Sequence, residues 1–414
     1  MTTTLLWLRR DLRVHDHPAL EAARRAGDHL VPVFCFDDRL LHGRHASGPR
    51  TQFLLECLAD LDDSLRRRGT ALVVRRGPPE REIPRLVRET NATAVHLSSD
   101  VSPYARGRDT RVRKALSVPV HEHPGTFVVE DLEAVRTTAG RPYTVFTPFY
   151  RTWARLPRRQ PHRAPRTLPP LPAGLDARTM PTLTDLRLDQ EVEAPRCRGG
   201  ETAVRSGESP LSPYLHFGCI SARELEVRSA ELERQLCWRD FFAHVLLHHP
   251  QNARSEYQAR YRGTIRWSRA RKRFEAWCEG RTGFPMVDAG MRQLRREGYM
   301  DNRARLVVGS FLTKDLGIDW RWGERWFMRL LLDGDEANNN GNWQWIASVG
   351  VDPQPVSRRI LNPALQQKRF DPDGAYVRRY VPELRDGRHG YPEPIVDHAQ
   401  ARREALARYR GAAK

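Results

Sequence analysis

Short apolar runs alternate with segments of helical periodicity in the N-terminal quarter of the chain, and this alternation limits the folds open to it. The apolar runs have the length of buried strands and cover 5–8, 30–36, 71–74 and 94–97. The helical segments between them cover 17–26, 51–68 and 81–90. Strands that alternate with helices form a parallel sheet with helices on both faces. We therefore expect a doubly wound α/β fold at the N-terminus.

The pattern changes to helices with little strand signal from about residue 199. Helical segments are expected over 222–248, 270–279, 290–297, 303–315 and 323–332. Eight of the ten tryptophans lie in this part of the chain. A Pro- and Arg-rich stretch, 157–195, precedes it and is typical of an extended linker. The sequence thus predicts an α/β domain over 1–130, a linker over 131–198 and an all-helical domain over 199–414.

Polar side chains follow the predicted strands and are candidates for a ligand site. Asp37 and Asp38 follow the second strand after Phe36, and Asp100 follows the fourth. Ligands of open parallel sheets bind at the carboxyl ends of the strands. No Gly-x-Gly-x-x-Gly follows the first strand, which argues against an ordinary dinucleotide site.

The charge balance is strongly basic. Lys and Arg number 69 against 51 for Asp and Glu, a formal net charge of +18. Such a surface attracts polyanions through phosphate contacts and counterion release, which favours DNA or RNA as a partner. The alternative is an Arg-rich solvated surface without a nucleic-acid partner.

The spacing of the cysteines and the distribution of apolar residues argue against several classes of protein. The six cysteines include no Cys-x-x-Cys pair, and no His-Glu-x-x-His occurs, so no metal site or disulfide framework is expected. No run approaches the roughly 20 apolar residues of a membrane span. The first residues do not form a secretory signal, because Arg9 and Arg10 come too early. We expect a cytoplasmic protein with no membrane contact.

Five motifs, in order along nearly the whole chain, resemble the photolyase/cryptochrome family. They occupy 6–13 (LWLRRDLR), 211–218 (LSPYLHFG), 235–241 (QLCWRDF), 283–293 (GFPMVDAGMRQ) and 333–345 (DGDEANNNGNWQW). Within the family the chain is most similar to bacterial class I cyclobutane pyrimidine dimer photolyases. The resemblance implies an N-terminal antenna domain and a helical domain that holds a U-shaped FAD. It also implies a carbon–carbon lyase that repairs DNA by electron transfer from reduced FAD under blue light.

The resemblance assigns a set of residues to FAD. A carboxylate pair beside an Arg can accept flavin hydrogen bonds while the Arg keeps it ionised. Serines at a helix start can hold phosphate oxygens, although an ordinary helix cap explains them equally well. Asn339 matches the position that faces flavin N5, where an amide favours repair over signalling. The full set is Glu208, Ser209, Leu211, Ser212, Arg305, Asp333, Asp335 and Asn339.

Three tryptophans match the electron relay of the family. Trp267, Trp320 and Trp343 occupy the matching positions, and together with Asn339 they form the predicted catalytic set. Indole oxidises at accessible potentials, so spaced indoles can pass electrons in hops. The alternative for any single Trp is ordinary core packing.

The resemblance assigns a second set to damaged DNA. Photolyases belong to the base-flipping enzymes, and Trp238 matches the tryptophan that stacks on the flipped bases. Arg239 is expected to meet phosphate, and Arg358 and Arg359 add positive charge nearby. The complete predicted set is Gln235, Trp238, Arg239, Asn302, Arg303 and Gln366.

Three departures from the family pattern stand out. Many dimer photolyases have Glu where this chain has Gln235, and Gln also occurs in (6-4) photolyases and animal cryptochromes. Leu306 replaces a Met near the lesion, and Asp301 replaces a His. About two dozen residues are missing between 199 and 209, which we expect to weaken FAD retention.

The antenna pocket resembles that of members that use 8-hydroxy-5-deazaflavin more than methenyltetrahydrofolate. The stretch 98–109 lacks the Glu associated with the folate, and Asp100 and residues 34–38 are expected near the pocket. An empty pocket or a second flavin stays open. The protein is expected to act as a monomer.

Three alternatives to dimer repair remain at this stage. Gln235 and the shortened segment keep a cryptochrome-type photoreceptor open. Repair of (6-4) photoproducts is a second alternative, although the paired His signature of those enzymes is absent. A basic helical DNA-binding protein without flavin is the third.

Overall fold

The computed structural model describes residues 1–177, 179–188, 210–385 and 390–412. By their contacts these residues form two compact units, with the boundary between Pro250 and Gln251. The compact units therefore do not coincide with the change in sequence pattern near residue 199. Each unit is described separately below.

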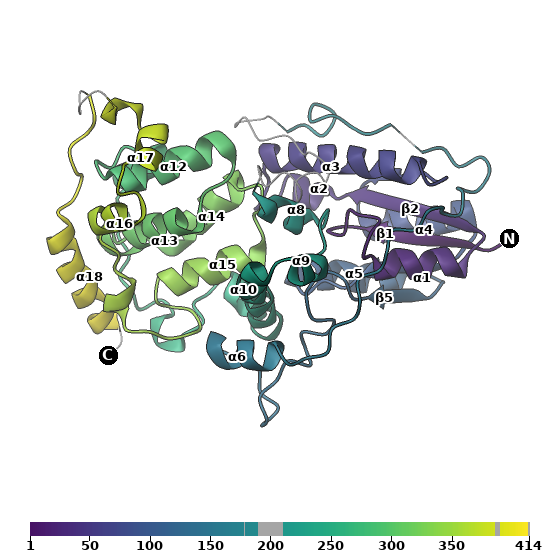
Figure 1. Cartoon of the computed structure of the whole chain (residues 1–414), viewed down its shortest axis with the longest axis horizontal. Coiled ribbons are helices and arrows are strands. Elements are labelled where there is room, and N and C mark those ends of the chain that lie inside the picture. The colour runs from purple at the N-terminus through teal and green to yellow at the C-terminus, as the bar shows by residue number, and fades with distance from the viewer. Residues whose placement is uncertain (178, 189–209, 386–389, 413–414) are drawn as a thin grey trace. The chain divides into compact units, whose positions relative to one another are not determined.

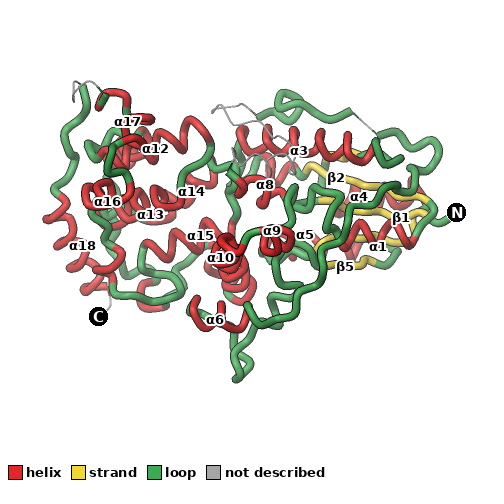
Figure 2. The backbone as a smooth tube through the Cα atoms, viewed as in Figure 1, coloured by secondary structure: helices red, strands yellow, loops and turns green. Residues whose placement is uncertain are grey.

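A five-stranded parallel sheet forms the centre of the first unit. Its order is β3-β2-β1-β4-β5, and every neighbouring pair is parallel (Figure 2). Because the order reverses at β1, successive crossovers cover opposite faces and both faces are buried. The strands are β1 (Thr3–Leu8), β2 (His29–Phe36), β3 (Val73–Arg76), β4 (Ala92–Ser98) and β5 (Val120–His123).

The crossover helices follow the strands in the order that the alternating pattern predicts. Proline occupies the first turn of α1, α3, α4 and α5, where its missing N–H costs nothing. Ile83 and Leu86 of α4 and Val112 of α5 pack on the strands in one core cluster. The helices are α1 (Pro18–Ala26), α2 (Asp38–Leu41), α3 (Gly48–Arg66), α4 (Pro79–Thr90), α5 (Pro103–Ala115) and α6 (Phe146–Trp153).

Three further helices complete the first unit: α8 (Leu211–Phe217), α9 (Ala222–Arg228) and α10 (Ala230–His248). The end of α8 is tied to the loop after β1, where Leu12 N donates to Phe217 O at 3.1 Å. Gly218 has φ +70°, and a Cβ there would lie 2.0 Å from Arg10 O. Only glycine therefore fits at this junction.

The segment between α6 and the undescribed residues has no helix or strand over 157–177 and 179–188. It is nevertheless attached to the α/β unit along its length. Leu168 N donates to Arg68 O at 2.8 Å, and Leu30 N donates to Pro170 O at 3.2 Å. It contains turns near 173–174 and 183–187, and Leu186 N donates to Thr182 O at 3.1 Å.

The second unit consists of helices (Figure 1). Its core brings together Trp277, Phe311, Trp320 and Trp343, all at most 3% exposed. Short 3₁₀ turns occur at Pro250–Ala253, Ala259–Tyr261, Val356–Arg359 and Pro382–Leu384, and a π-turn at Phe311–Asp315. The helices are α11 (Arg271–Glu279), α12 (Pro285–Glu297), α13 (Asn302–Ser310), α14 (Trp320–Leu330), α15 (Glu336–Ile346), α16 (Pro363–Phe370), α17 (Ala375–Tyr380) and α18 (His398–Ala412).

The fold class expected from the sequence is confirmed: a parallel sheet with helices precedes a mostly helical region. Two details differ. The helix expected over 222–248 is divided at Ser229, whose backbone is extended with φ −146° and ψ 103°. The helix expected over 303–315 changes to a π-turn after Ser310.

Buried neutral histidines make the first unit sensitive to acid. His17 caps α1 by accepting a hydrogen bond from Leu20 N at 3.2 Å, and burial lowers its pKa to about 4. His244 accepts a hydrogen bond from Tyr143 N at 3.1 Å, and burial lowers its pKa to about 4. In the unfolded chain both would take up protons near their ordinary pKa of about 6.5.

Stability is therefore expected to fall as the pH drops from 6.5 toward 4, because the unfolded chain binds more protons in that window. For His17 alone the loss between pH 7 and pH 5 is roughly 2 kcal/mol. Urea unfolding followed by circular dichroism checks this. The variant His17→Asn keeps a cap acceptor without a titrating ring and should lose correspondingly less stability; an unchanged pH dependence would contradict the assignment.

Candidate functional site

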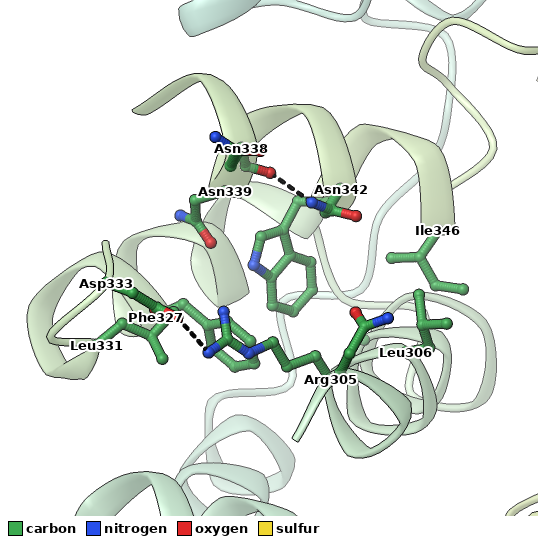
Figure 3. Close-up of a pocket in the computed structure, with 12 residues that line it drawn as sticks. Arg305, Leu306, Phe327, Leu331, Asp333, Asn338, Asn339, Asn342 and Ile346 are labelled. Carbon is green, nitrogen blue, oxygen red and sulfur yellow. Dashed lines mark hydrogen bonds and ion pairs between the residues drawn. The ribbon is translucent and has the colours of Figure 1, made fainter. Parts of the chain in front are cut away.

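A pocket in the second unit is lined by charged, amide, aliphatic and aromatic side chains. It has a volume of about 80 Å³ and is partly open to solvent. Its walls come from α13, the end of α14, the following turn and α15 (Figure 3). The lining residues are Asn302, Arg305, Leu306, Gly309, Phe327, Leu331, Asp333, Asn338, Asn339, Asn342, Trp343 and Ile346.

An ion pair between Arg305 and Asp333 forms one polar side of the pocket. Arg305 Nη2 donates to Asp333 Oδ2 at 2.7 Å, and Arg305 Nε donates to Met300 O at 2.8 Å (Figure 3). Because two separate nitrogens are held, the guanidinium cannot turn freely. Its fixed charge orients the partner carboxylate.

The polar face of α15 supplies amides. Asn339 lines the pocket and is 8% exposed, and its Nδ2 donates to Glu324 O at 3.0 Å. This bond fixes the amide, so that its oxygen is presented on the pocket side (Figure 3). Asn342 Nδ2 donates to Asn338 O at 2.8 Å. Asn339 therefore offers a hydrogen-bonding group in a defined orientation.

Asp335 has a structural role at the start of α15. Its Oδ1 accepts hydrogen bonds from Asn338 N and Asn338 Nδ2, both at 2.8 Å. This is an N-cap, and it orients the helix that carries Asn339 and Trp343. Asp335 is not among the residues that line the pocket.

The opposite walls are apolar. Leu306, Leu331 and Ile346 line them together with aromatic rings. Trp343 packs edge-on against Phe327 with ring centroids 5.0 Å apart. A pocket with an aromatic and aliphatic lining and a fixed polar edge suits a planar ring system with hydrogen-bonding atoms along its rim.

The three predicted relay tryptophans lie in the second unit: Trp343 on α15, Trp320 at the start of α14, and Trp267 before α11. Gly323 lets the Trp343 ring lie close to the backbone of α14, because a Cβ at Gly323 would be 2.1 Å from Trp343 Cη2. Trp320 lies on the same face of α14, one turn before Gly323. Ser268, next to Trp267, pairs with Ile318 in an isolated parallel bridge. Trp343 and Trp320 are 3% and 1% exposed, whereas Trp267 is partly exposed.

The Trp238 side chain of α10, in the first unit, is half-buried and does not belong to the core. Its ring stacks on Phe146 with centroids 3.7 Å apart and planes at 1°. Gln235, one turn earlier on α10, is exposed. Arg239 donates to Thr126 O at 2.8 Å and lies over the Phe127 ring at 5.2 Å, so it anchors the 126–129 loop.

Asp240 supports the same loop from within the core. Its Oδ2 accepts from Trp153 Nε1 at 3.0 Å and from Val128 N at 3.1 Å. Burial raises the pKa of this carboxyl to about 6. Sequence reasoning did not assign Asp240, although it follows Trp238 and Arg239 directly.

The remaining DNA candidates of the second unit lie on α13 and α16. Asn302 lines the pocket. Arg303 lies over the ring of Phe370 at 4.2 Å, and Phe370 is one turn beyond Gln366 on α16. Arg303 and α16 are thus neighbours. Arg358 is exposed, whereas Arg359 is buried over Trp345 at 4.1 Å and cannot meet a DNA strand.

The predicted phosphate-binding residues are only partly described. Leu211 and Ser212 are the first two residues of α8 and are partly buried. Glu208 and Ser209, and the shortened segment before them, lie outside the described residues.

Charged side chains gather at the carboxyl ends of the strands in the first unit. Asp37 accepts hydrogen bonds from the Tyr104 hydroxyl and from Arg39 Nε, the latter at 2.9 Å. Arg39 in turn pairs with Glu80 at 2.8 Å, and this bond lowers the pKa of Glu80 to about 2. Arg10 pairs with Asp100 at 3.4 Å. Of these residues, the α/β pattern singled out Asp37 and Asp100.

The described residues contain neither a cluster suited to a metal ion nor a helix suited to span a membrane. No three His, Cys, Asp or Glu side chains among them are placed to hold a metal ion. None of the described helices combines the length and apolar character needed to cross a membrane.

Comparisons with known proteins decide the family. The model for "DNA photolyase" matches residues 4–172, and the model for "FAD binding domain of DNA photolyase" matches residues 232–388. The chain belongs to the DNA photolyase family. A deoxyribodipyrimidine photo-lyase of Streptomyces griseus is 39% identical over 97% of this chain and 98% of its own length. That alignment spans 454 positions, so the relative has residues that this 414-residue chain lacks.

Solved structures agree with the photolyase assignment. An archaeal photolyase from Sulfolobus tokodaii, described with two FAD molecules, has a TM-score of 0.86 and 32% identity, covering 99% of this chain and 100% of its own. A Synechocystis cryptochrome has a TM-score of 0.86 and 28% identity, covering 99% of each chain. The recognition made from the motifs is confirmed.

The pocket of this photolyase fits FAD. The matched FAD-binding region contains the whole pocket. A fixed cation–carboxylate pair and an oriented amide face an aromatic wall, which matches the polar rim and flat apolar faces of an isoalloxazine. Sequence reasoning named Asn302, Arg305, Asp333, Asn339 and Trp343 among the lining residues. It missed Phe327, Leu331 and Ile346, whose only signal is helical spacing from residues already named.

The close approach at Gly323 yields a test of the packing. Gly323→Ala places a methyl group where Trp343 and Leu312 now lie, at 2.1 and 2.6 Å. We expect a loss of about 1–3 kcal/mol in the free energy of unfolding and weaker FAD retention. Gly411→Ala in α18 meets nothing within 4 Å and is the matched control. Equal stability of the two variants in urea would show that the contact is not tight.

Proposed function

We propose that this chain is a light-driven lyase that opens cyclobutane pyrimidine dimers in DNA. The pocket formed by Arg305, Asp333, Asn339 and Trp343 carries the proposal, because its lining combines an ion pair, an amide and an aromatic ring inside the region matched by the FAD-binding family model. The name of the Streptomyces griseus relative supports the substrate class. The net charge of +18 supports a DNA partner.

Bound FAD in its reduced form supplies the electron that light sends to the dimer. Arg305 and Asp333 would hold the polar rim of the ring system, and the Asn339 amide would supply a hydrogen bond to it. The apolar walls exclude water from the ring faces. No general acid, nucleophile or metal is required for the ring opening.

Each unit contributes its own residues to lesion binding: α10 in the first unit, and α13 and α16 in the second. Trp238 presents a flat face on which flipped bases stack, and Phe146 holds it rigid. Gln235 offers an exposed amide for hydrogen bonding to the dimer. Asn302, Arg303 and Gln366 contact the lesion or its strand, and Arg303 supplies a charge for phosphate.

The tryptophan relay restores the reduced flavin. An electron leaves Trp343 at the pocket, Trp320 refills Trp343, and Trp267 refills Trp320. The partial exposure of Trp267 allows an external reductant to complete the sequence. The assigned roles of Asp335 and Ser212 are then to position α15 and to meet the FAD phosphates.

We also propose an antenna chromophore at the strand ends of the first unit. Asp37, Tyr104, Arg39 and Asp100 form the polar edge there. We favour 8-hydroxy-5-deazaflavin over methenyltetrahydrofolate. The Sulfolobus tokodaii photolyase described with two FAD molecules makes a second flavin the other outcome. Mass spectrometry of the released chromophores distinguishes 8-hydroxy-5-deazaflavin, methenyltetrahydrofolate and a second flavin.

The deciding experiment is blue-light repair by the chemically reduced protein. Cyclobutane and (6-4) lesions are offered in separate oligonucleotides, and the recovered intact thymines are counted by chromatography. We expect repair of the cyclobutane lesion alone. Repair of the (6-4) lesion alone would overturn the substrate assignment.

A cryptochrome-type photoreceptor is the second candidate, and Gln235 is the observation that favours it. If FAD is bound and reducible but neither lesion is repaired, the photoreceptor replaces the lyase. The variant Gln235→Glu then decides whether this one side chain is responsible. If Gln235→Glu repairs a lesion, Gln235 is the reason that the parent protein does not.

Removal of the Trp238 ring is expected to weaken lesion binding. Base stacking on an aromatic ring contributes roughly 1–3 kcal/mol, so Trp238→Ala should lower affinity for a damaged oligonucleotide by about 5- to 150-fold. Trp238→Phe keeps a flat ring and should retain most of the affinity. Fluorescence anisotropy with damaged and undamaged oligonucleotides provides the measurement. Equal affinity of the Ala variant and the parent protein refutes the stacking role.

Interruption of the relay should separate photoreduction from repair. Trp320→Phe is expected to slow photoreduction of bound FAD by at least about tenfold, while chemically reduced enzyme keeps nearly all its repair activity. Trp322→Phe, two residues further along α14, is the control and should photoreduce normally. Loss of both activities in the Trp320 variant would place that residue in the core rather than in the relay.

A further inference from the structure

Positive charge is concentrated in the stretch of chain that contains Trp267, the outer tryptophan of the proposed relay. Residues 254–273 hold eight Lys and Arg side chains and one acidic residue, Glu256. The net charge of these 20 residues is +7, against +18 for all 414. An evenly basic surface would place far less charge here. We call the eight side chains the cationic patch: Arg254, Arg260, Arg262, Arg266, Arg269, Arg271, Lys272 and Arg273.

The cationic patch is exposed and is hardly neutralised by the protein itself. All eight side chains are exposed. Arg271 pairs with Glu275 at 3.1 Å, and no other member forms an ion pair with a described carboxylate. Glu256 offsets none of this charge, because it is 2% exposed and is paired with Arg321 at 2.7 Å. The patch therefore presents a positive surface to solvent.

The first turn of α11 adds to this positive potential. Arg271, Lys272 and Arg273 are the first three residues of the helix, which has no acidic residue in that turn and no side-chain cap. A helix N-terminus is the positive end of the helix dipole, where acidic side chains are the stabilising choice. Three cations there oppose the dipole. An anionic partner would relieve this unfavourable interaction.

Trp267 lies within the patch and is accessible from one side only. Arg266 precedes it directly, and Arg269 follows it by two residues. On its inner side the ring packs edge-on against the buried Tyr409, with centroids 6.2 Å apart. Lys314 Nζ donates to the Tyr409 hydroxyl at 2.7 Å, which holds that ring in place. A reductant therefore reaches the partly exposed indole from the cationic side.

The backbone that carries the patch is fixed to the second unit. Ser268 N donates to Gly317 O at 2.7 Å, and Arg262 Nε donates to Glu256 O at 2.8 Å. Ile265 is 6% exposed and belongs to the hydrophobic core. The cations are thus displayed on an ordered support, so a partner does not have to order a loose segment when it binds.

We propose that the cationic patch docks an acidic electron-carrier protein, which reduces oxidised Trp267. The proposal rests on the relay of the proposed function, which supplies Trp267 as a radical cation. One electron passes from the reduced one-electron centre of the partner to the Trp267 ring. The products are neutral Trp267 and a partner oxidised by one electron. No covalent bond forms or breaks, and no proton moves.

An acidic protein fits the patch better than the other anions do. The patch extends over a 3₁₀ turn, a loop and a helix start, which is more charge than a small anion can contact at once. DNA would be attracted by the same charges, but its phosphates cannot reduce an indole. Complexes between electron-transfer proteins have small interfaces, and complementary charge steers their association. A partly exposed redox-active ring among cations suits such a complex.

The test is time-resolved absorption of the flavin-loaded full chain after a light pulse, with reduced plastocyanin as the acidic probe. We expect the tryptophan radical to decay faster as plastocyanin is added, and oxidised copper to appear at the same rate. The second-order rate constant should fall about tenfold between about 10 mM and about 300 mM salt, because salt screens the attraction. Reduced cytochrome c, a basic protein, is the control and should react slowly at low salt.

Two double variants of equal charge locate the effect. Arg266→Glu with Arg269→Glu should lower the rate constant for plastocyanin about tenfold at low salt. Arg88→Glu with Lys114→Glu makes the same change in net charge at exposed positions of α4 and α5, and should react like the parent protein. Flavin content and repair by chemically reduced enzyme should be unchanged in both.

Equal rate constants for the two double variants overturn the proposal, as does a rate constant of the parent protein that is independent of salt. If the Arg266 and Arg269 variant loses as much affinity for an undamaged duplex oligonucleotide as it loses rate with plastocyanin, DNA is the partner and the proposal fails. It also fails if the variant slows the reaction with hexacyanoferrate(II) but not with plastocyanin, because the partner is then a small anion.

A measurement in the dark separates this inference from the proposed function. Nuclear magnetic resonance of isotope-labelled, reduced plastocyanin follows its binding to the flavin-loaded protein. If binding depends on Arg266 and Arg269 but no tryptophan radical follows excitation, the relay is wrong and the docking surface holds. If the radical forms but plastocyanin neither binds nor reduces it, the docking surface is wrong and the relay holds.

Discussion

The absence of a side chain at Gly323 is the constraint on which the second unit depends. It lets the edge of Trp343 enter α14, at a place where a single methyl group would lie 2.1 Å from the indole. Helices that approach so closely fix each other's rotation, because ridges and grooves interlock. The rotation of α15 in turn fixes which of its asparagines face the pocket. One missing Cβ therefore sets both the pocket wall and the spacing between Trp343 and Trp320.

Burial has different effects on two kinds of residue in this unit. It keeps the indoles of Trp343 and Trp320 away from water, which suits the electron transfer proposed for them. It also deprives Lys314 of solvation, which lowers the pKa of its amine.

The sequence predicted the fold class and the residues of the pocket's polar edge, but not their arrangement. Alternation of apolar runs indicated the parallel sheet because strand length and helix periodicity are local properties. The motif around Asp333 pointed to a flavin site only through family resemblance, since Asp-Gly-Asp alone is also an ordinary turn. Asp335 caps α15, a role that local spacing allows but does not distinguish from that of a ligand, and its assignment to FAD stays a prediction. Lys314 and Tyr409 could not be paired from sequence, because 95 residues separate them.

The π-turn at Phe311–Asp315 also affects which changes in chain length this protein can tolerate. A π-turn holds one more residue than an α-helical turn and often originates as a one-residue insertion. Deletion of any residue within it would restore α-helical winding and rotate one flank against the other by about 100°. Lys314 would then leave the Tyr409 hydroxyl, and α14, which carries Gly323, would turn relative to Trp343 of α15. This segment can accept substitutions as long as its number of residues does not change. Among relatives we therefore expect its length to be conserved more strictly than its sequence.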